Sequence, residues 1–167
     1  MSDHGFDGVP TAAEVLLDLV DAGLVRGSGE LTPLTGGVSC EVWRIAAGDL
    51  EADVRERNPH GLVVKAPLAP LRTPSLWQAD ISRGFAEAIA LQCFGQLTPS
   101  AVPRVVWRHP EAPVLVIEAA PQTWQDWREQ MLNAESGSPE LAGARLSAMA
   151  THLGETLATW HVRTREV

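Results

Sequence analysis

A glycine pair between two strand-like stretches, followed by a third stretch that contains a lysine, constrains the fold of this chain more than any other feature. Apolar and β-branched residues predict strands over 30–34, 39–45 and 61–66. The glycines at 36–37 fall between the first two strands and predict a turn. Lys65 lies in the run Leu-Val-Val-Lys of the third strand. We therefore expect consecutive strands with a cation on the third.

The second strand and the region after it carry different patterns. Alternation along 39–45 places Glu41, Trp43 and Ile45 on one face of the strand. Residues 48–60 are charged and break this alternation. We expect an exposed hairpin loop over 48–60.

Two helices are predicted around these strands. Thr11 and Glu14 fit a capping box, which predicts a helix over 11–23 that ends at Gly23. A second helix is predicted over 77–95, because its apolar residues recur at steps of four. The side chains expected to form its apolar stripe are Ile81, Phe85, Ile89 and Cys93, with Ala88 and Leu91 broadening it.

The remaining third of the chain adds strands and then becomes helical. Strands are predicted over 104–107 and 114–118, with a turn-rich connection between them. After Pro121 we expect a short helix over 123–132 and a long helix that begins with an N-cap at Ser138. The long helix carries an apolar stripe of Leu141, Leu146, Met149, Leu153, Leu157 and Trp160.

This order of elements predicts an α+β fold in which one helix packs on a five-stranded antiparallel sheet. We expect three parts along the chain. Residues 1–28 would form a tail and an N-terminal helix, and residues 29–121 would form the sheet domain. Residues 122–167 would form a helical linker and the first helix of a second lobe.

The composition limits the classes of function. The 167 residues are 45% apolar and 20% charged, which is ordinary for a globular protein. The net charge of −8 argues against a general nucleic-acid binder, because such proteins neutralise phosphates with Lys and Arg. The first residues do not resemble a secretion signal, and no apolar run approaches the ~18 residues of a membrane span. We expect a cytoplasmic protein that binds neither nucleic acid nor membrane.

The cysteines and tryptophans are interpreted as structural. Cys40 and Cys93 form no CxxC pair, so a disulfide framework or zinc site is not expected. Because the chain is acidic, its tryptophans are expected to pack in the interior rather than to stack on bases. The residues concerned are Trp77, Trp107, Trp124, Trp127 and Trp160.

Four segments, in chain order, match the parts that a protein needs to hold ATP. The loop 35–40 could offer backbone N–H groups to the phosphates, because glycine lets the backbone approach a ligand closely. Lys65 could supply the fixed cation, and Glu87 the carboxylate that positions it. The extended segment 117–121 could meet the edge of the adenine.

Each of these segments also has an ordinary explanation. The glycine loop could be only a hairpin turn, and Lys65 could be an outward-facing strand lysine. Glu87 could form a surface pair with Arg83, which lies one helical turn before it. Segment 117–121 could be an ordinary strand exit. The functional hypothesis therefore depends on the order of all four together.

Taken in that order, these segments resemble the N-terminal part of the aminoglycoside phosphotransferase family, whose relatives include choline kinase and methylthioribose kinase. The resemblance is collinear and spans about residues 30–165. It is carried by 34–39, 41–44, 63–65, 77–83 with Glu87, 102–103, 114–121 and 153–158 with His161.

The resemblance implies a protein-kinase-like N-terminal lobe, with ATP bound between two lobes. It implies that Lys65 contacts the phosphates and pairs with Glu87. The phosphate-covering loop would consist of Gly36, Gly37, Val38 and Ser39. Backbone groups of Glu118 and Ala120 would meet the adenine. These eight residues are the expected nucleotide-binding set.

The catalytic residues of the family have no counterpart in this sequence. In the family, a catalytic Asp in a His-Gly-Asp-like loop, an Asn and a second Asp that hold Mg²⁺ all belong to the second lobe. We therefore expect a truncated, ATP-binding lobe that contains no catalytic or metal-binding residue. Such a lobe would be inactive as an enzyme when alone. It would use Mg²⁺ only when a second lobe is supplied. The alternative is a non-catalytic module that binds a partner, a separate second lobe or a further copy of itself, through the last helix.

Overall fold

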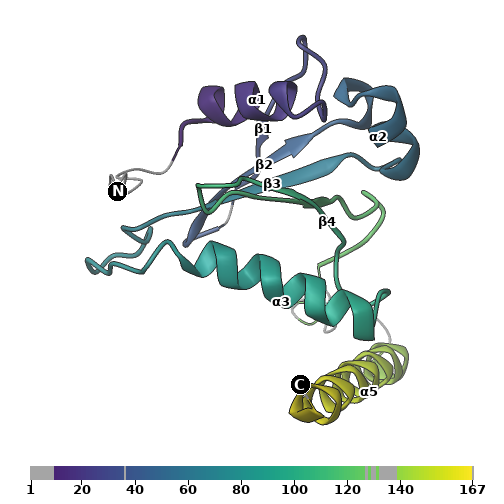
Figure 1. Cartoon of the computed structure of the whole chain (residues 1–167). Helices are drawn as coiled ribbons and strands as arrows, with labels where there is room; N and C mark the ends of the chain where they lie inside the picture. The colour runs from purple at the N-terminus through teal and green to yellow at the C-terminus, as the bar shows by residue number, and fades with distance from the viewer. Residues whose placement is uncertain (1–9, 36, 127, 129–130, 132–138, 167) are drawn as a thin grey trace.

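Five antiparallel strands form the centre of the structure, in the order β1-β2-β3-β5-β4 (Figure 1). The structure is a computed structural model, which describes residues 10–35, 37–126, 128, 131 and 139–166. The strands are β1 (Thr32–Pro33), β2 (Cys40–Ile45), β3 (Leu62–Pro67), β4 (Val105–Arg108) and β5 (Leu115–Glu118). The predicted α+β class and the five-stranded antiparallel sheet are confirmed.

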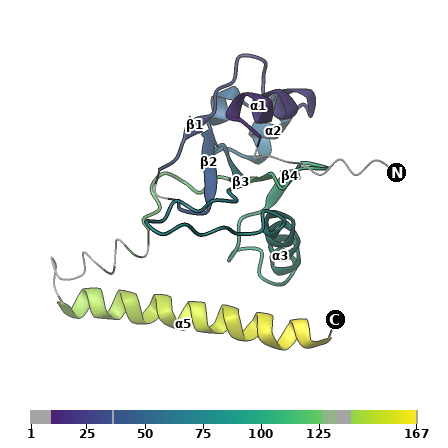
Figure 2. The ribbon, with the colours of Figure 1, turned by 90° about the vertical axis from the view of Figure 1, so that its left-hand side faces the viewer.

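Helices lie on both sides of this sheet (Figures 1 and 2). In the described part of the chain, α1 (Ala12–Asp21) and α2 (Ala52–Arg57) cover one face, which we name the core face. Helix α3 (Arg83–Leu97) lies across the other face, which we name the α3 face. Helix α5 (Pro139–Arg163) lies beyond α3 and is followed by a short 3-10 turn, η3 (Thr164–Glu166). None of the described helices has the length and apolarity to cross a membrane.

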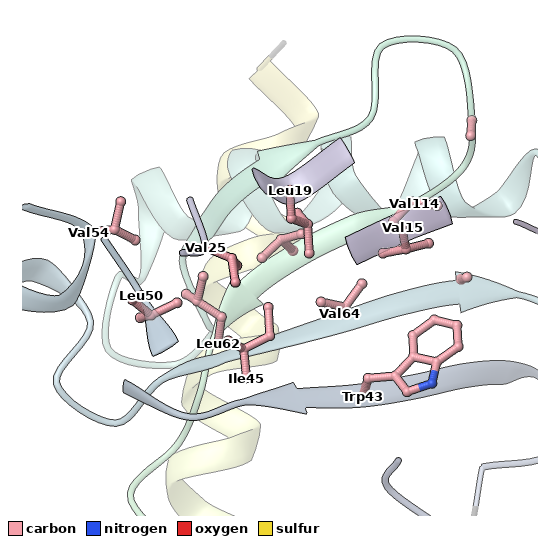
Figure 3. Close-up of a cluster of buried hydrophobic side chains, with 13 residues drawn as sticks. Val15, Leu19, Val25, Trp43, Ile45, Leu50, Val54, Leu62, Val64 and Val114 are labelled. Carbon is pink, nitrogen blue, oxygen red and sulfur yellow. The ribbon is translucent and has the colours of Figure 1, made fainter. Parts of the chain in front are cut away.

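The hydrophobic core lies between the core face and helices α1 and α2 (Figure 3). Alternate residues of β2 and β3 point into it, which matches the predicted alternation of Trp43 and Ile45. Helix α1 contributes Val15 and Leu19, so it shares one core with the strands. The remaining members are Val25, Leu50, Val54, Leu62, Val64, Ala66, Ala112, Val114 and Val116.

Helix α1 begins and ends as its sequence predicts. The Thr11 hydroxyl accepts from the Glu14 N–H at 3.3 Å, and the Glu14 carboxylate accepts from the Thr11 N–H at 2.7 Å. This reciprocal pair satisfies two N–H groups that the first helical turn leaves without partners. Gly23 follows the helix with φ of 69°, a conformation that only glycine adopts at little cost.

Residues 48–60 differ from the exposed loop that was predicted. They include most of a short 3-10 turn, η1 (Ala47–Asp49), and all of α2. Leu50 and Val54 are buried in the core, at 0% and 3% exposure. Val54 is the one buried residue of α2, and Leu50 lies two residues before the helix, while the charged residues of α2 are exposed. One apolar residue shows no helical period, so the sequence did not reveal this helix.

Helix α3 begins six residues later than predicted and packs through only part of its predicted stripe. Gly84 and Ala88 are the buried residues, whereas Ile89 is 58% exposed and Cys93 is exposed. A Cβ placed at Gly84 would lie 2.6 Å from the carbonyl oxygen of Pro113. The helix backbone therefore approaches the sheet too closely for large side chains, so the prediction is confirmed for Ala88 and wrong for Ile89 and Cys93.

The C-terminal elements follow their prediction in part. Strands β4 and β5 lie within one residue of their predicted bounds, and a long helix follows. The predicted cap at Ser138 falls outside the described residues. The predicted helix over 123–132 was wrong for 123–126, which are not helical because the Trp124 N–H closes a turn on the Pro121 carbonyl. Arg128 and Met131 are helical, and the other residues of that range fall outside the described residues. Helix α5 contacts α3 where Trp160 stacks on Phe94, with ring centroids 4.1 Å apart, and donates to the Thr98 hydroxyl at 2.7 Å.

Candidate functional site

Lys65 and Glu87 form an ion pair across the α3 face. Lys65 is the only lysine of the chain, and it lies on the central strand β3, opposite Val42 of β2 and Leu115 of β5. The Lys65 and Glu87 side chains are 27% and 37% exposed, so the pair is partly shielded yet reachable from solvent. The structure thus brings together the cation and the carboxylate that the sequence placed 22 positions apart.

The geometry of α3 explains why this pair forms. Gly84 and Ala88 let the helix lie close to the sheet, and Glu87 follows on the same side of the helix. Arg83 does not take Glu87 as its partner, which was the ordinary explanation for Glu87. Its guanidinium instead donates to backbone carbonyls of Ser39 and Leu68, at 2.6 and 2.8 Å.

The glycine loop lies beside Lys65. Gly36 is outside the described residues, and Gly37, Val38 and Ser39 follow it into β2. A Cβ at Gly37 would lie 3.8 Å from a methyl group of Val42, the residue paired with Lys65. Val38 is 51% exposed, so its side chain does not fill the site. Gly37 therefore lies over the strand position next to the Lys65 backbone.

Two arginines tie this loop to the segment after β3, and neither contact was predicted from the sequence. The Arg72 N–H donates to the Val38 carbonyl at 2.9 Å, and its guanidinium pairs with Glu41. The Leu68 N–H and the Arg83 side chain both donate to the Ser39 carbonyl. These contacts involve residues up to 44 positions apart, a separation that local patterns do not report.

The expected adenine segment leaves β5 in an extended form. The Glu118 N–H donates to the Arg104 carbonyl at 3.0 Å, and the Glu118 carboxylate accepts from the Arg104 N–H at 2.9 Å. The Ala119 N–H donates to the Gly61 carbonyl at 3.0 Å, and Ala120 is exposed. The backbone groups that remain candidates for a ligand are therefore the Glu118 carbonyl and the amide of Ala120.

A cavity of about 640 Å³ lies against this segment. Val63 and Ile117 line it from the sheet, and both lie on the α3 face with Lys65, because Val63 is two residues before Lys65 on β3. The lining from the other side is Pro99, Ser100, Ala101, Val102 and Pro103, with Ala119, Ala120, Pro121 and Trp124 beside the Glu118 exit and His60 at one end. The volume and the mostly apolar lining are typical of a small-molecule site.

Trp124 lines this cavity and is 71% exposed, so the prediction that it packs in the interior was wrong. Trp77 is also exposed, at 65%, while Trp107 and Trp160 are partly buried, and Trp127 lies outside the described residues. The Trp124 N–H donates to the Pro121 carbonyl at 3.0 Å, which forms a turn directly after the strand exit. The sequence signal that could have placed Trp124 beside the strand exit was its position, three residues after Pro121.

One titratable group close to the site departs from its ordinary behaviour. The Ser82 N–H donates to Asp80 at 2.8 Å just before α3, and this hydrogen bond lowers the pKa of Asp80. Within the described residues, no three side chains of His, Cys, Asp or Glu lie together as a metal site would require. The chemistry that this arrangement offers is the binding of an anion by one fixed cation, next to a mostly apolar cavity.

No protein-family model matches the chain, and no curated protein matches it significantly.

Proposed function

We propose that this chain is the nucleotide-binding, N-terminal lobe of an ATP-dependent small-molecule phosphotransferase, a kinase that transfers phosphate to a hydroxyl group. The observation that carries the proposal is the Lys65–Glu87 ion pair, which shares the α3 face with the cavity beside Glu118. A partly buried lysine is costly without a partner. Glu87 supplies that partner and leaves the ammonium group reachable from solvent, which suits a cation that meets a triphosphate.

The proposed binding mode follows the α3 face of β3. The adenine occupies the cavity against Val63 and Ile117, with its edge toward the Glu118 carbonyl and the Ala120 amide. The phosphates extend toward Lys65, roughly 7 Å further along the strand, at two residues of ~3.3 Å each. Gly37 to Ser39 cover them, and the ammonium group, held by Glu87, neutralises part of their charge.

The proposal is limited to holding the nucleotide. Phosphoryl transfer also requires a positioned base and bound Mg²⁺. The sequence contains no His-Gly-Asp-like loop followed by an Asn and a second Asp. Those groups, and the site for the phosphate acceptor, would come from a second lobe, and Mg²⁺ would bind where that lobe contributes its ligands.

Titration of the 167-residue chain with Mg·ATP, followed by the signal of its single lysine, tests the proposal. With ¹⁵N-labelled lysine, the one Nζ resonance should shift on addition of ATP, and Lys65→Ala should weaken ATP binding roughly tenfold or more. Arg108→Ala, an equal loss of charge at an exposed position of β4, should leave binding unchanged. If ATP neither shifts the Lys65 resonance nor binds more weakly to Lys65→Ala, the proposal is wrong.

A second candidate function is a non-catalytic module that binds a partner or a further copy of itself. The observation that favours it is on α5, where Leu153 and Leu157, four residues apart on one helical face, are 40% and 41% exposed. Contiguous exposed apolar side chains are typical of interfaces. Sedimentation of the chain and of Leu153→Glu/Leu157→Glu separates the alternatives. A concentration-dependent dimer that the substitutions abolish favours the module, and a monomer that binds ATP favours the lobe.

A further inference from the structure

Arg83 is the first residue of α3 and occupies a position that a basic side chain does not favour. The N-terminus of a helix carries a partial positive charge, so an arginine there is repelled rather than attracted. The first turn of α3 contains no acidic residue, and Asp80, whose charge interacts with that of Arg83, precedes the helix. The contacts that favour a cation at this place therefore lie outside the helix.

The reason lies in the contacts of its guanidinium. One terminal nitrogen of Arg83 donates to the Ser39 carbonyl at 2.6 Å and to the Leu68 carbonyl at 2.8 Å, and the other donates to the Asp80 carbonyl at 2.9 Å. Ser39 ends the glycine loop, and Leu68 directly follows β3, the strand of Lys65. The first two contacts are partly buried.

We propose that Arg83 is a positioning residue, which holds the glycine loop at a fixed height above Lys65 so that a phosphate fits between them. One helix carries both Arg83, which fixes the loop, and Glu87, which fixes the ammonium group of Lys65. The loop and the cation are thereby held by a single rigid element. The inference rests on the proposed nucleotide function, since it assigns Arg83 to the phosphate side of the same site.

The position of Arg83 also predicts which part of the ligand it does not affect. Its described contacts lie on the loop, on the strand end and on Asp80 just before α3, whereas the cavity beside Glu118 is lined by other residues. Loss of Arg83 should therefore weaken the binding of the triphosphate and spare the binding of the nucleoside. A residue that only supports the fold would weaken both.

The test compares Arg83→Gln, Arg83→Lys and the charge-matched control Arg108→Gln in the full chain, with Mg·ATP and adenosine as ligands. For Arg83→Gln we expect ATP affinity to fall roughly tenfold and adenosine affinity to stay within about twofold. Arg83→Lys keeps the positive charge but loses the planar guanidinium that donates to several carbonyls at once, and it should recover part of the ATP affinity. Arg108→Gln should change neither affinity. Equal losses for ATP and adenosine, or no loss for ATP, would overturn the proposal.

Amide hydrogen exchange provides a readout that does not depend on nucleotide binding. The Leu68 and Arg72 N–H groups donate to Ser39 and Val38 of the loop, so Arg83→Gln should accelerate their exchange roughly tenfold. The Val64 amide, in the core strand, should not change. If the wild-type chain binds no ATP but this local acceleration occurs, the nucleotide function fails while Arg83 still holds the loop. Exchange that is unchanged at Leu68, or accelerated throughout the sheet, overturns the role of Arg83.

Discussion

The two faces of the sheet are formed by the same strands, but their side chains are buried to different extents. On the core face, Leu62 and Val64 of β3 are fully buried beneath α1 and α2. On the α3 face, Val63 and Lys65 of the same strand are only partly buried, and a cavity and an ion pair take the place of a continuous core. One face thus supplies most of the apolar burial, which leaves the other free to keep polar groups and an open volume.

Neighbouring valines of β3 provide the sharpest test of this comparison, and the largest expected effect. Val64→Ala removes methyl groups from the core face and should lower the free energy of unfolding by about 2–3 kcal/mol. Val63→Ala makes the same change on the α3 face, where we expect a loss below about 1 kcal/mol together with weaker adenosine binding. Urea unfolding midpoints of both variants measure the difference. Equal losses of stability would mean that the faces do not divide their roles.

The close approach of α3 can be broken at Gly84. Gly84→Ala places a Cβ within 2.6 Å of the Pro113 carbonyl oxygen, so the helix must shift, at a cost of about 1–3 kcal/mol. The matched control is Gly154→Ala in α5, where a Cβ meets nothing within 4 Å and should stabilise the helix by about 0.5–1 kcal/mol. Opposite signs in thermal unfolding are expected. The Lys65 Nζ resonance should also change in Gly84→Ala alone.

Trp124 tests whether the cavity on the α3 face takes a base. Stacking of a base on an aromatic side chain contributes ~1–3 kcal/mol, so Trp124→Ala should weaken both ATP and adenosine binding by roughly five- to a hundredfold. Because the side chain is 71% exposed, the free energy of unfolding should change by less than about 0.5 kcal/mol. Trp77→Ala, at a tryptophan that is 65% exposed and does not line the cavity, is the control. Equal behaviour of the two variants would remove Trp124 from the site.

The smallest expected effect concerns the two acids at the helix starts, one on each side of the sheet. Hydrogen bonds from the Thr11 and Ser82 N–H groups lower the pKa of Glu14 and of Asp80 below their ordinary values of 4.5 and 3.8. Since the unfolded chain takes up these protons first as the pH falls, both groups stabilise the folded state at neutral pH. This stabilisation is lost as the pH drops through the lowered pKa of each group.

Thermal unfolding between about pH 7 and about pH 3 measures that loss. Glu14→Gln and Asp80→Asn should each reduce the acid dependence of the melting temperature, by a small amount because both carboxyl groups are exposed. A steeper acid dependence in either variant would contradict the expected direction of the effect.

Some elements of the fold were predictable from the sequence, and others were not. The alternation in β2 and the capping box of α1 are local patterns, and both were predicted correctly. The pairing of Lys65 with Glu87 was expected from the order of the segments and from the family resemblance, and the structure contains this ion pair. Helix α2 was missed because its one buried residue, Val54, cannot show a period. The apolar stripe of α3 was wrong in part, because Ile89 and Cys93 are exposed while Ala88 is buried.

By itself, the sequence determined the five strands along the chain and the ends of α1, since each depends on contacts between near neighbours in the chain. Only the tertiary structure decided which side of α3 meets the sheet, that Arg83 reaches Ser39, and that Trp124 stands at a cavity. The physical reason is distance along the chain. How closely two backbones approach is set by the smallest residues at their contact, and no local period records which residues those are.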